Sequence, residues 1–288
     1  MTKAFQRKFL AALAVLALLS TYVAIGFAIC AGFPQITRNL ANEHSNFNSS
    51  PYTHDALMEL ALETRDYTVE DYDRGSAGLE GAHEALAAEV VDAAHTSSDA
   101  GSPTADRWSV EACQALDEAD VSPLVTMEEL SQAGPQYALS SEALSHLDDV
   151  NEVISSLRMP LLGITLIAAF CLMGLVYMFG AKPAGWSLLI AGCATLGLFA
   201  LVGLWAAFGF DGFFAVLHGL FFSEGTWTFP ADSLLIQMYP QGFWMGMGLW
   251  WLSASCITAV ASIVIGYLIV RKRKPNAAET FVPAGQQA

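Results

Sequence analysis

The sequence predicts an all-α membrane protein with four transmembrane helices, an extracytoplasmic helical segment, and an apolar interfacial loop between the third and fourth spans. Crossing a hydrocarbon core of about 30 Å takes roughly 20 consecutive apolar residues in a helix. Four runs reach that length without a charged residue, at positions 9–33, 161–180, 186–208 and 246–270. Because a lipid-exposed backbone must satisfy its own hydrogen bonds, these runs are expected to be helices.

Charged residues around the four runs predict how the chain is oriented. Lys and Arg in short flanking segments tend to stay in the cytoplasm. Here they lie at positions 3, 7 and 8 before the first span, at Lys182 between the second and third, and at 271–274 after the fourth. Both termini are therefore expected to be cytoplasmic. Of the 28 acidic residues, all but Glu279 then face outward, and the net charge of -15 makes nucleic acid an unfavourable partner.

The chain divides into four parts on this pattern. Residues 1–33 form the cytoplasmic N-terminus and first span, 34–159 an extracytoplasmic acidic segment, 160–270 spans two to four with the interfacial loop at 211–245, and 271–288 a cytoplasmic tail. Positions 75–134 are rich in Ala, Glu, Asp, Ser and Gly and poor in large apolar residues. That composition is typical of a weakly packed or disordered insertion.

Two amphipathic helices are expected in the acidic segment, one on each side of this insertion. Apolar residues recur at helical spacing between Leu57 and Thr64. After the insertion, a helix-start signal at Ser140 precedes an apolar stripe made of Leu144, Leu147, Val150, Ile154 and Leu157. We expect this second helix to lie at the membrane surface and to run towards Pro160, before the second span begins.

The interfacial loop holds the first candidate for chemistry. Between positions 213 and 244 it places His218 and Asp232 among nine aromatic residues. A helical turn would set the ring of His218 between Phe214 and Phe222, four residues away on either side. Asp232 is expected either to orient His218 or to cap a helix that begins near Ser233. The alternative function for these aromatic residues is an interfacial belt, with His218 reaching headgroup water or phosphate.

A second candidate lies at the start of the helix that leads into the second span. His146 and Asp149 are three residues apart, and helical neighbours at that spacing share a face. A carboxylate beside an imidazole can fix its tautomer and raise its basicity, as a general base requires. The alternative is an ordinary surface histidine near a carboxylate. The remaining histidines, at positions 44, 54, 83 and 95, have no partner at an informative spacing and are expected to be mostly exposed to solvent.

Two sequence blocks resemble the lipoprotein intramolecular transacylase (Lit) family of bacterial integral membrane proteins. The first block is His146 followed by Asp149 and Val150. The second follows the pattern F-x-x-x-H-x-x-F-F, W, P-x-D-x-L and P-x-x-F, here at Phe214, His218, Phe221, Phe222, Trp227, Pro230, Asp232, Leu234, Pro240 and Phe243.

The resemblance implies an enzyme of the bacterial cell membrane whose partners are diacylated lipoproteins and membrane lipids. It would move one acyl chain from the diacylglyceryl group to the amine of the same N-terminal cysteine, giving the lyso form. His146 and His218 would be catalytic, with Asp149, Asp232 and Trp227 as supporting residues and no cofactor or metal. We expect His146, oriented by Asp149, to act as the base.

His218 would then be the acid or the oxyanion donor.

Two other classes of function compete with the transacylase prediction. The acidic segment could belong to a non-enzymatic receptor that binds cations or a partner protein. A zinc-dependent hydrolase could use His146, His218 and Asp232, although these three positions match no recognised ligand spacing.

Overall fold

The computed structural model describes residues 2–70, 78–79, 81, 83–85, 88 and 126–271, and these residues form helices and loops without a strand. The cytoplasmic tail beyond residue 271 and most of the 75–134 insertion, with Cys113 and His95, lie outside the described residues. The helices are α1 (Lys3–Gly32), α2 (Pro34–His44), α3 (His54–Val69), α6 (Met127–Ala133), α7 (Ser141–Phe179), α8 (Ala181–Phe208), α9 (Phe210–Gly219), α10 (Leu234–Met238) and α11 (Gln241–Arg271).

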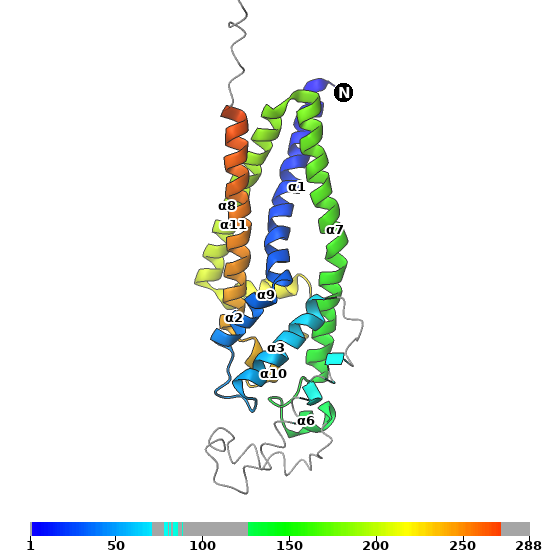
Figure 1. Ribbon diagram of the computed structural model, residues 1–288, viewed down its shortest axis with the longest axis vertical. Coiled ribbons are helices and arrows are strands. Elements are labelled where there is room, and N and C mark those ends of the chain that lie inside the picture. The colour runs from blue at the N-terminus through cyan, green and yellow to red at the C-terminus, as the bar shows by residue number, and fades with distance from the viewer. Residues whose placement is uncertain are drawn as a thin grey trace, which may run out of the picture.

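Four long helices, α1, α7, α8 and α11, run side by side as a bundle (Figure 1). Each is long and apolar enough to cross a membrane, which confirms the four predicted spans. Small residues let α8 and α11 approach closely. A Cβ added at Gly192 would lie 2.6 Å from the carbonyl oxygen of Ala259, and one at Gly266 would lie 2.6 Å from the carbonyl oxygen of Gly185.

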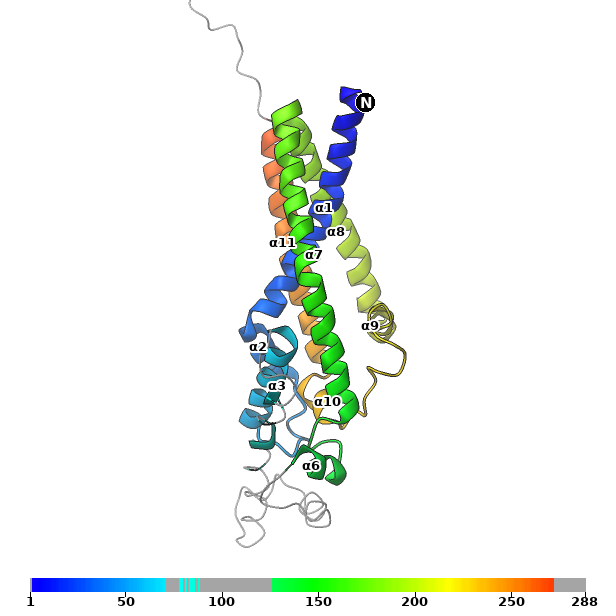
Figure 2. The same ribbon diagram turned by 90° about the vertical axis from the view of Figure 1, so that its right-hand side faces the viewer.

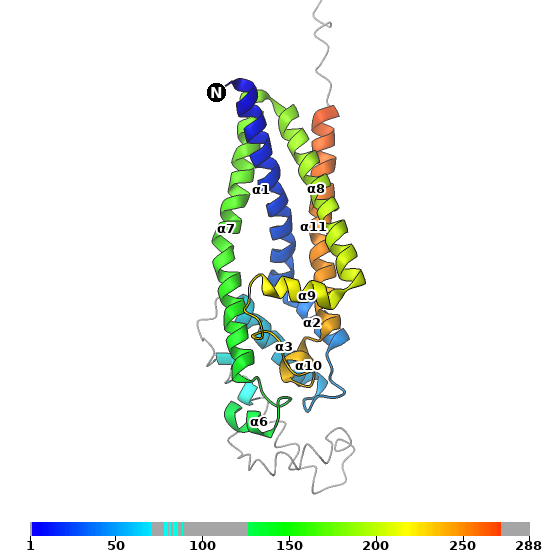
Figure 3. The ribbon, with the colours of Figure 1, turned by 180° about the vertical axis from the view of Figure 1, so that it is seen from behind.

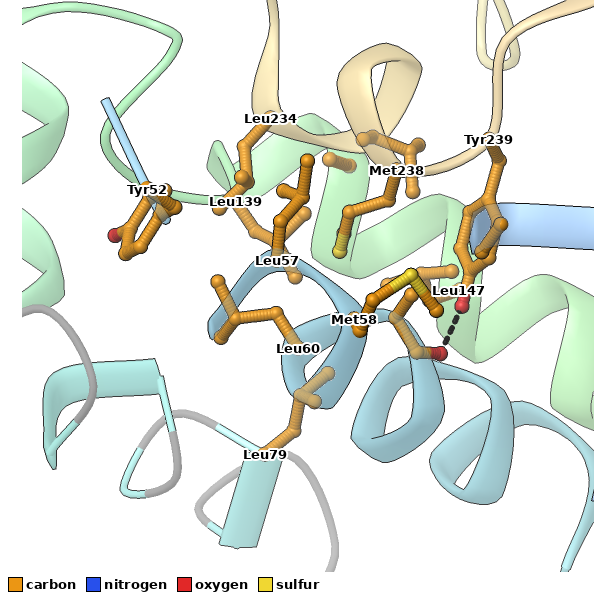
Figure 4. Packing of buried hydrophobic residues seen from close by; sticks show 14 of the residues in the cluster. Tyr52, Leu57, Met58, Leu60, Leu79, Leu139, Leu147, Leu234, Met238 and Tyr239 are labelled. Atoms are coloured by element: carbon orange, nitrogen blue, oxygen red, sulfur yellow. Dashed lines mark hydrogen bonds between the residues drawn. The ribbon is translucent and has the colours of Figure 1, made fainter. Parts of the chain in front are cut away.

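At the end of the bundle away from the N-terminus, the shorter helices form a second body, which we call the head (Figures 1 and 2). The head comprises α2, α3, α6, α10 and the first turns of α7, packed around one buried apolar cluster. Leu57 and Leu60 on α3 meet Leu234 and Met238 of α10 there, and all four are fully buried. The hydroxyl of Tyr239 donates to the carbonyl oxygen of Ala61 and ties α10 to α3 (Figure 4).

The helix that begins after Ser140 differs from the prediction at its far end. Ser140 caps it as expected, with its hydroxyl oxygen accepting from the amide of Ala143 at 3.2 Å. The helix then continues through Pro160 into the second span as one element of 39 residues. A proline removes its own amide donor and crowds the carbonyl four residues before it, and membrane-spanning helices tolerate both because nearby groups and local adjustments satisfy the freed backbone. His146 therefore lies on the same rod as the second span, not on a separate surface helix.

Parts of the 75–134 segment pack into the head. Leu79 and Leu130 are buried in its apolar cluster, and His83 is 1% exposed. The Nε2 atom of His83 lies 3.3 Å from the hydroxyl of Thr64 on α3. The expectation that His83 is exposed was wrong, because contacts far along the chain bury it. Burial disfavours the charged ring and lowers the pKa of His83 to about 4.

Candidate active site

Helix α9 lies across the bundle where α8 ends, close to the head (Figures 2 and 3). Gly209 separates the two helices, and its amide closes the last turn of α8 on the carbonyl of Trp205 at 3.0 Å. Beyond α9, the amide of Phe222 donates to the carbonyl of His218 at 2.8 Å, so the chain turns sharply after this histidine. The loop then reaches the head, where the amide of Leu234 donates to the carbonyl of Pro135 at 2.9 Å.

This path brings the two candidate histidines together. The ring centroids of His146 on α7 and His218 on α9 are 6.3 Å apart, with the ring planes inclined by 29°. A group that acts on a reacting atom lies about 3 to 3.5 Å from that atom. The two rings are neighbours, so a substrate group bound beside them can lie near both imidazoles.

Aromatic side chains surround the pair. Phe214 and Trp227 have ring centroids 3.8 and 5.0 Å from that of His218. Phe222 and Phe229 lie 4.8 and 5.7 Å from His146. His146 is consequently only 9% exposed. We call this cluster of two histidines and four aromatic residues the histidine pocket, a name that stands for these six side chains.

The histidine pocket keeps both rings neutral near pH 7. His146 lies in the charged first turns of α7, outside the apolar stretch, and burial lowers its pKa to about 4. The nearby His218 lowers this pKa further, while Asp149 raises it. Burial also lowers the pKa of His218, against an opposing hydrogen bond to Phe214. Neutral imidazoles have a lone pair to accept a proton, so each ring can act as a base.

The hydrogen bonds distinguish the two rings. The Nδ1 atom of His218 lies 3.0 Å from the carbonyl oxygen of Phe214. Since a carbonyl oxygen can only accept, neutral His218 carries its hydrogen on Nδ1 and has its lone pair on Nε2. The Nδ1 atom of His146 and the indole nitrogen of Trp227 are both buried, and neither has a hydrogen-bond partner in the part of the chain that the structure describes.

Asp149 and Asp232, the carboxylates predicted to support the two histidines, do not orient them through hydrogen bonds in the described chain. Asp149 is near enough to raise the pKa of His146, but no hydrogen bond joins the two in the described chain. Asp232 is exposed and uses its backbone carbonyl to accept from Gln237 at 2.9 Å, while Ser233 occupies the N-cap position of α10. The group that orients His218 is the carbonyl of Phe214, one helical turn away. Sequence reasoning missed it because every helical residue offers a carbonyl at that spacing.

Sequence reasoning also missed Phe229, because only the path of the loop after α9 brings it to His146.

Groups of three or more His, Cys, Asp and Glu residues that could hold a metal ion do not occur among the described residues. Asp232 in particular does not join the two histidines.

Comparison with known proteins points to one family. The family model of the lipoprotein intramolecular transacylase Lit matches residues 123–244, a range that holds both histidines. No curated protein sequence matches the chain. Among solved structures, the membrane-integral lipoprotein intramolecular transacylase Lit from Bacillus cereus matches with a TM-score of 0.60 and 14% identity, over 93% of this chain and 97% of the other.

Two histidine variants of the same Bacillus cereus protein match as well. The variant with arginine in place of a histidine has a TM-score of 0.56 and the variant with alanine 0.58, each at 14% identity and over 93% of this chain. The matches cover 93% and 95% of the two variant chains, respectively. The fold is thus shared along nearly the whole chain, and the resemblance indicated by the two sequence blocks is confirmed.

Proposed function

We propose that this protein is a membrane transacylase that moves one acyl chain from the diacylglyceryl group of a bacterial lipoprotein to the α-amine of the same N-terminal cysteine. The observation that carries the proposal is the pair of neutral histidines, 6.3 Å apart in an aromatic pocket. The Lit family model spans both of them, and the fold match extends over 93% of the chain.

The reaction needs groups that move one proton. A neutral amine attacks the ester carbonyl carbon, a C–N bond forms, and the bond from that carbon to the glyceryl oxygen breaks. The proton lost by the nitrogen ends on the glyceryl oxygen, so no other reactant is consumed. A base must collect this proton and return it, and a donor must hold the leaving oxygen.

The hydrogen bonds of the pocket favour His218 as the base. Its Nε2 lone pair is fixed by the contact between Nδ1 and Phe214, whereas the Nδ1 atom of His146 has no such partner in the described chain. His218 takes the amine proton and delivers it to the glyceryl oxygen. His146 presents its N–H to that oxygen, and the negative charge of Asp149 favours this donor role. These roles are the reverse of those expected from the sequence.

The aromatic walls favour transfer over hydrolysis. Water that reached the ester would compete with the amine, and the four aromatic rings of the histidine pocket limit its access. The nucleophile and the ester belong to one molecule, so holding them in contact can supply part of the roughly 7 to 11 kcal/mol available from proximity. The pocket therefore needs to orient its substrate more than to activate it.

The reaction is proposed for the extracytoplasmic side of the membrane. The N-terminus and the last described turn of α11 lie at the end of the bundle opposite to the head (Figure 1). That end carries Lys3, Arg7, Lys8, Lys182 and Arg271, and such a cluster favours the cytoplasm. The head and the histidine pocket then face outward, where mature lipoproteins are anchored.

Purified protein tests the two histidines directly. A synthetic diacylglyceryl-cysteine peptide in detergent should be converted by the wild-type protein, and the His146→Ala and His218→Ala variants should each lose more than about 100-fold in rate. His54→Ala is the matched control, because His54 lies on the head near Phe47 and away from the pocket. Conversion at the wild-type rate by both pocket variants would rule out the mechanism.

A further inference from the structure

The loop after α9 returns one tryptophan to the histidine pocket. Gly225 has a φ of 87°, a conformation that side chains disfavour, and the amide of Thr226 closes the turn on the carbonyl of Ser223 at 3.3 Å. Trp227 follows at once, with its ring 5.0 Å from that of His218 and 6.3 Å from that of Phe214. The turn therefore sets an indole against the proposed base.

The indole N–H of Trp227 is a donor without an acceptor. Its Nε1 atom is buried and finds no hydrogen-bond partner in the described part of the chain. An indole N–H can only donate, and a buried donor without a partner is unfavourable. Trp251, by contrast, has an acceptor for its indole N–H, since its Nε1 donates to the carbonyl of Val23 at 3.0 Å.

The proposed reaction lacks one donor that this group could supply. When the amine attacks, negative charge develops on the carbonyl oxygen of the ester, and a positioned N–H stabilises it. The N–H of neutral His218 is committed to the carbonyl of Phe214. His146 serves the leaving glyceryl oxygen in the mechanism above. Among the described groups that face His218, the indole N–H of Trp227 remains.

We infer that Trp227 is a further catalytic residue, whose indole N–H binds the ester carbonyl oxygen of the substrate and stabilises the oxyanion of the tetrahedral intermediate. No proton leaves the indole in this step, because it acts as a hydrogen-bond donor throughout. The inference rests on the proposed transacylase function. It predicts that Trp227 contributes more to the transition state than to substrate binding.

The test removes the N–H and keeps an aromatic ring. In the purified full-length protein acting on the synthetic diacylglyceryl-cysteine peptide, Trp227→Phe should lower kcat by roughly 100- to 1,000-fold and change KM by less than about threefold. Trp227→His, which restores a ring N–H, should recover at least about tenfold of that loss. Trp250→Phe is the matched control, because Trp250 lies on the exposed outer face of α11.

Two results would overturn the inference. One is a kcat for Trp227→Phe within about threefold of wild type. The other is an equal loss in Trp227→Phe and Trp227→His together with a lower thermal unfolding midpoint, which would indicate a packing role. His218→Ala, assayed alongside, separates the two proposals: if it is inactive while Trp227→Phe is not, only the inference about Trp227 fails. If His218→Ala is fully active, the transacylase mechanism itself fails.

Discussion

Phe222 packs against both histidines, and replacing it tests how the pocket keeps them neutral. Its ring centroid lies 4.8 Å from that of His146 and 5.7 Å from that of His218. Phe222→Ser would admit water and let the pKa of His218, the proposed base, rise from its lowered value towards the ordinary value of about 6.5. At about pH 5.5 an imidazole with this ordinary pKa is only about 9% neutral, so the variant should lose up to about tenfold in rate as its base becomes protonated.

The substrate amine also changes its protonation with pH, so the quantity to compare is the ratio of the variant rate to the wild-type rate at each pH. The α-amine has a pKa of about 7.7 to 8.0, and its protonation slows every variant equally. Dividing the rate of Phe222→Ser by that of wild type at each pH cancels this effect. The ratio should fall by up to about tenfold between about pH 7.5 and 5.5. Phe222→Leu, which keeps the pocket dry, should give a constant ratio, and an equally constant ratio for Phe222→Ser would refute the account of the pocket.

Two further predictions concern stability. Since burial lowers the pKa of His83 to about 4, the unfolded chain binds more protons between about pH 6.5 and 4. The free energy of unfolding should therefore fall as pH drops through this range and be flat above it, and thermal unfolding of His83→Gln should show a smaller slope. Gly192→Ala should cost about 1 to 3 kcal/mol, because its Cβ would lie 2.6 Å from the Ala259 carbonyl. Gly197→Ala, with nothing within 4 Å, should not lower the denaturation midpoint in detergent.

The sequence predicts the spans well because length and apolar composition are sufficient to identify membrane helices. It does not predict where the helix that begins after Ser140 ends. A proline is often a helix boundary, and nothing in the sequence near Pro160 shows that the helix will continue through it. The burial of His83 depends on Thr64 of α3, a distant partner that spacing does not reveal.

The candidate site was only partly predictable. His146 and His218 follow from the resemblance, but their meeting depends on how α9 lies across the bundle (Figure 3). The roles of Asp149 and Asp232 were expected from residue type and spacing, yet the contact that fixes His218 is a backbone carbonyl. Backbone partners carry no sequence signal. The unpartnered indole nitrogen of Trp227 likewise becomes visible only when the loop is traced in space.

Tandem mass spectrometry of a reporter lipoprotein's N-terminal lipopeptide, made in a bacterial host that expresses this protein and lacks such an enzyme of its own, shows where each acyl chain is attached. Transfer within one molecule conserves mass, so the expected product is a lipopeptide of unchanged mass with one acyl chain on the amine as an amide and one left on the glyceryl group. The same product should be absent when His218→Ala replaces the wild-type protein. A lipopeptide lighter by one acyl chain, or one with both chains still on the glyceryl group, would rule out intramolecular transfer by this protein.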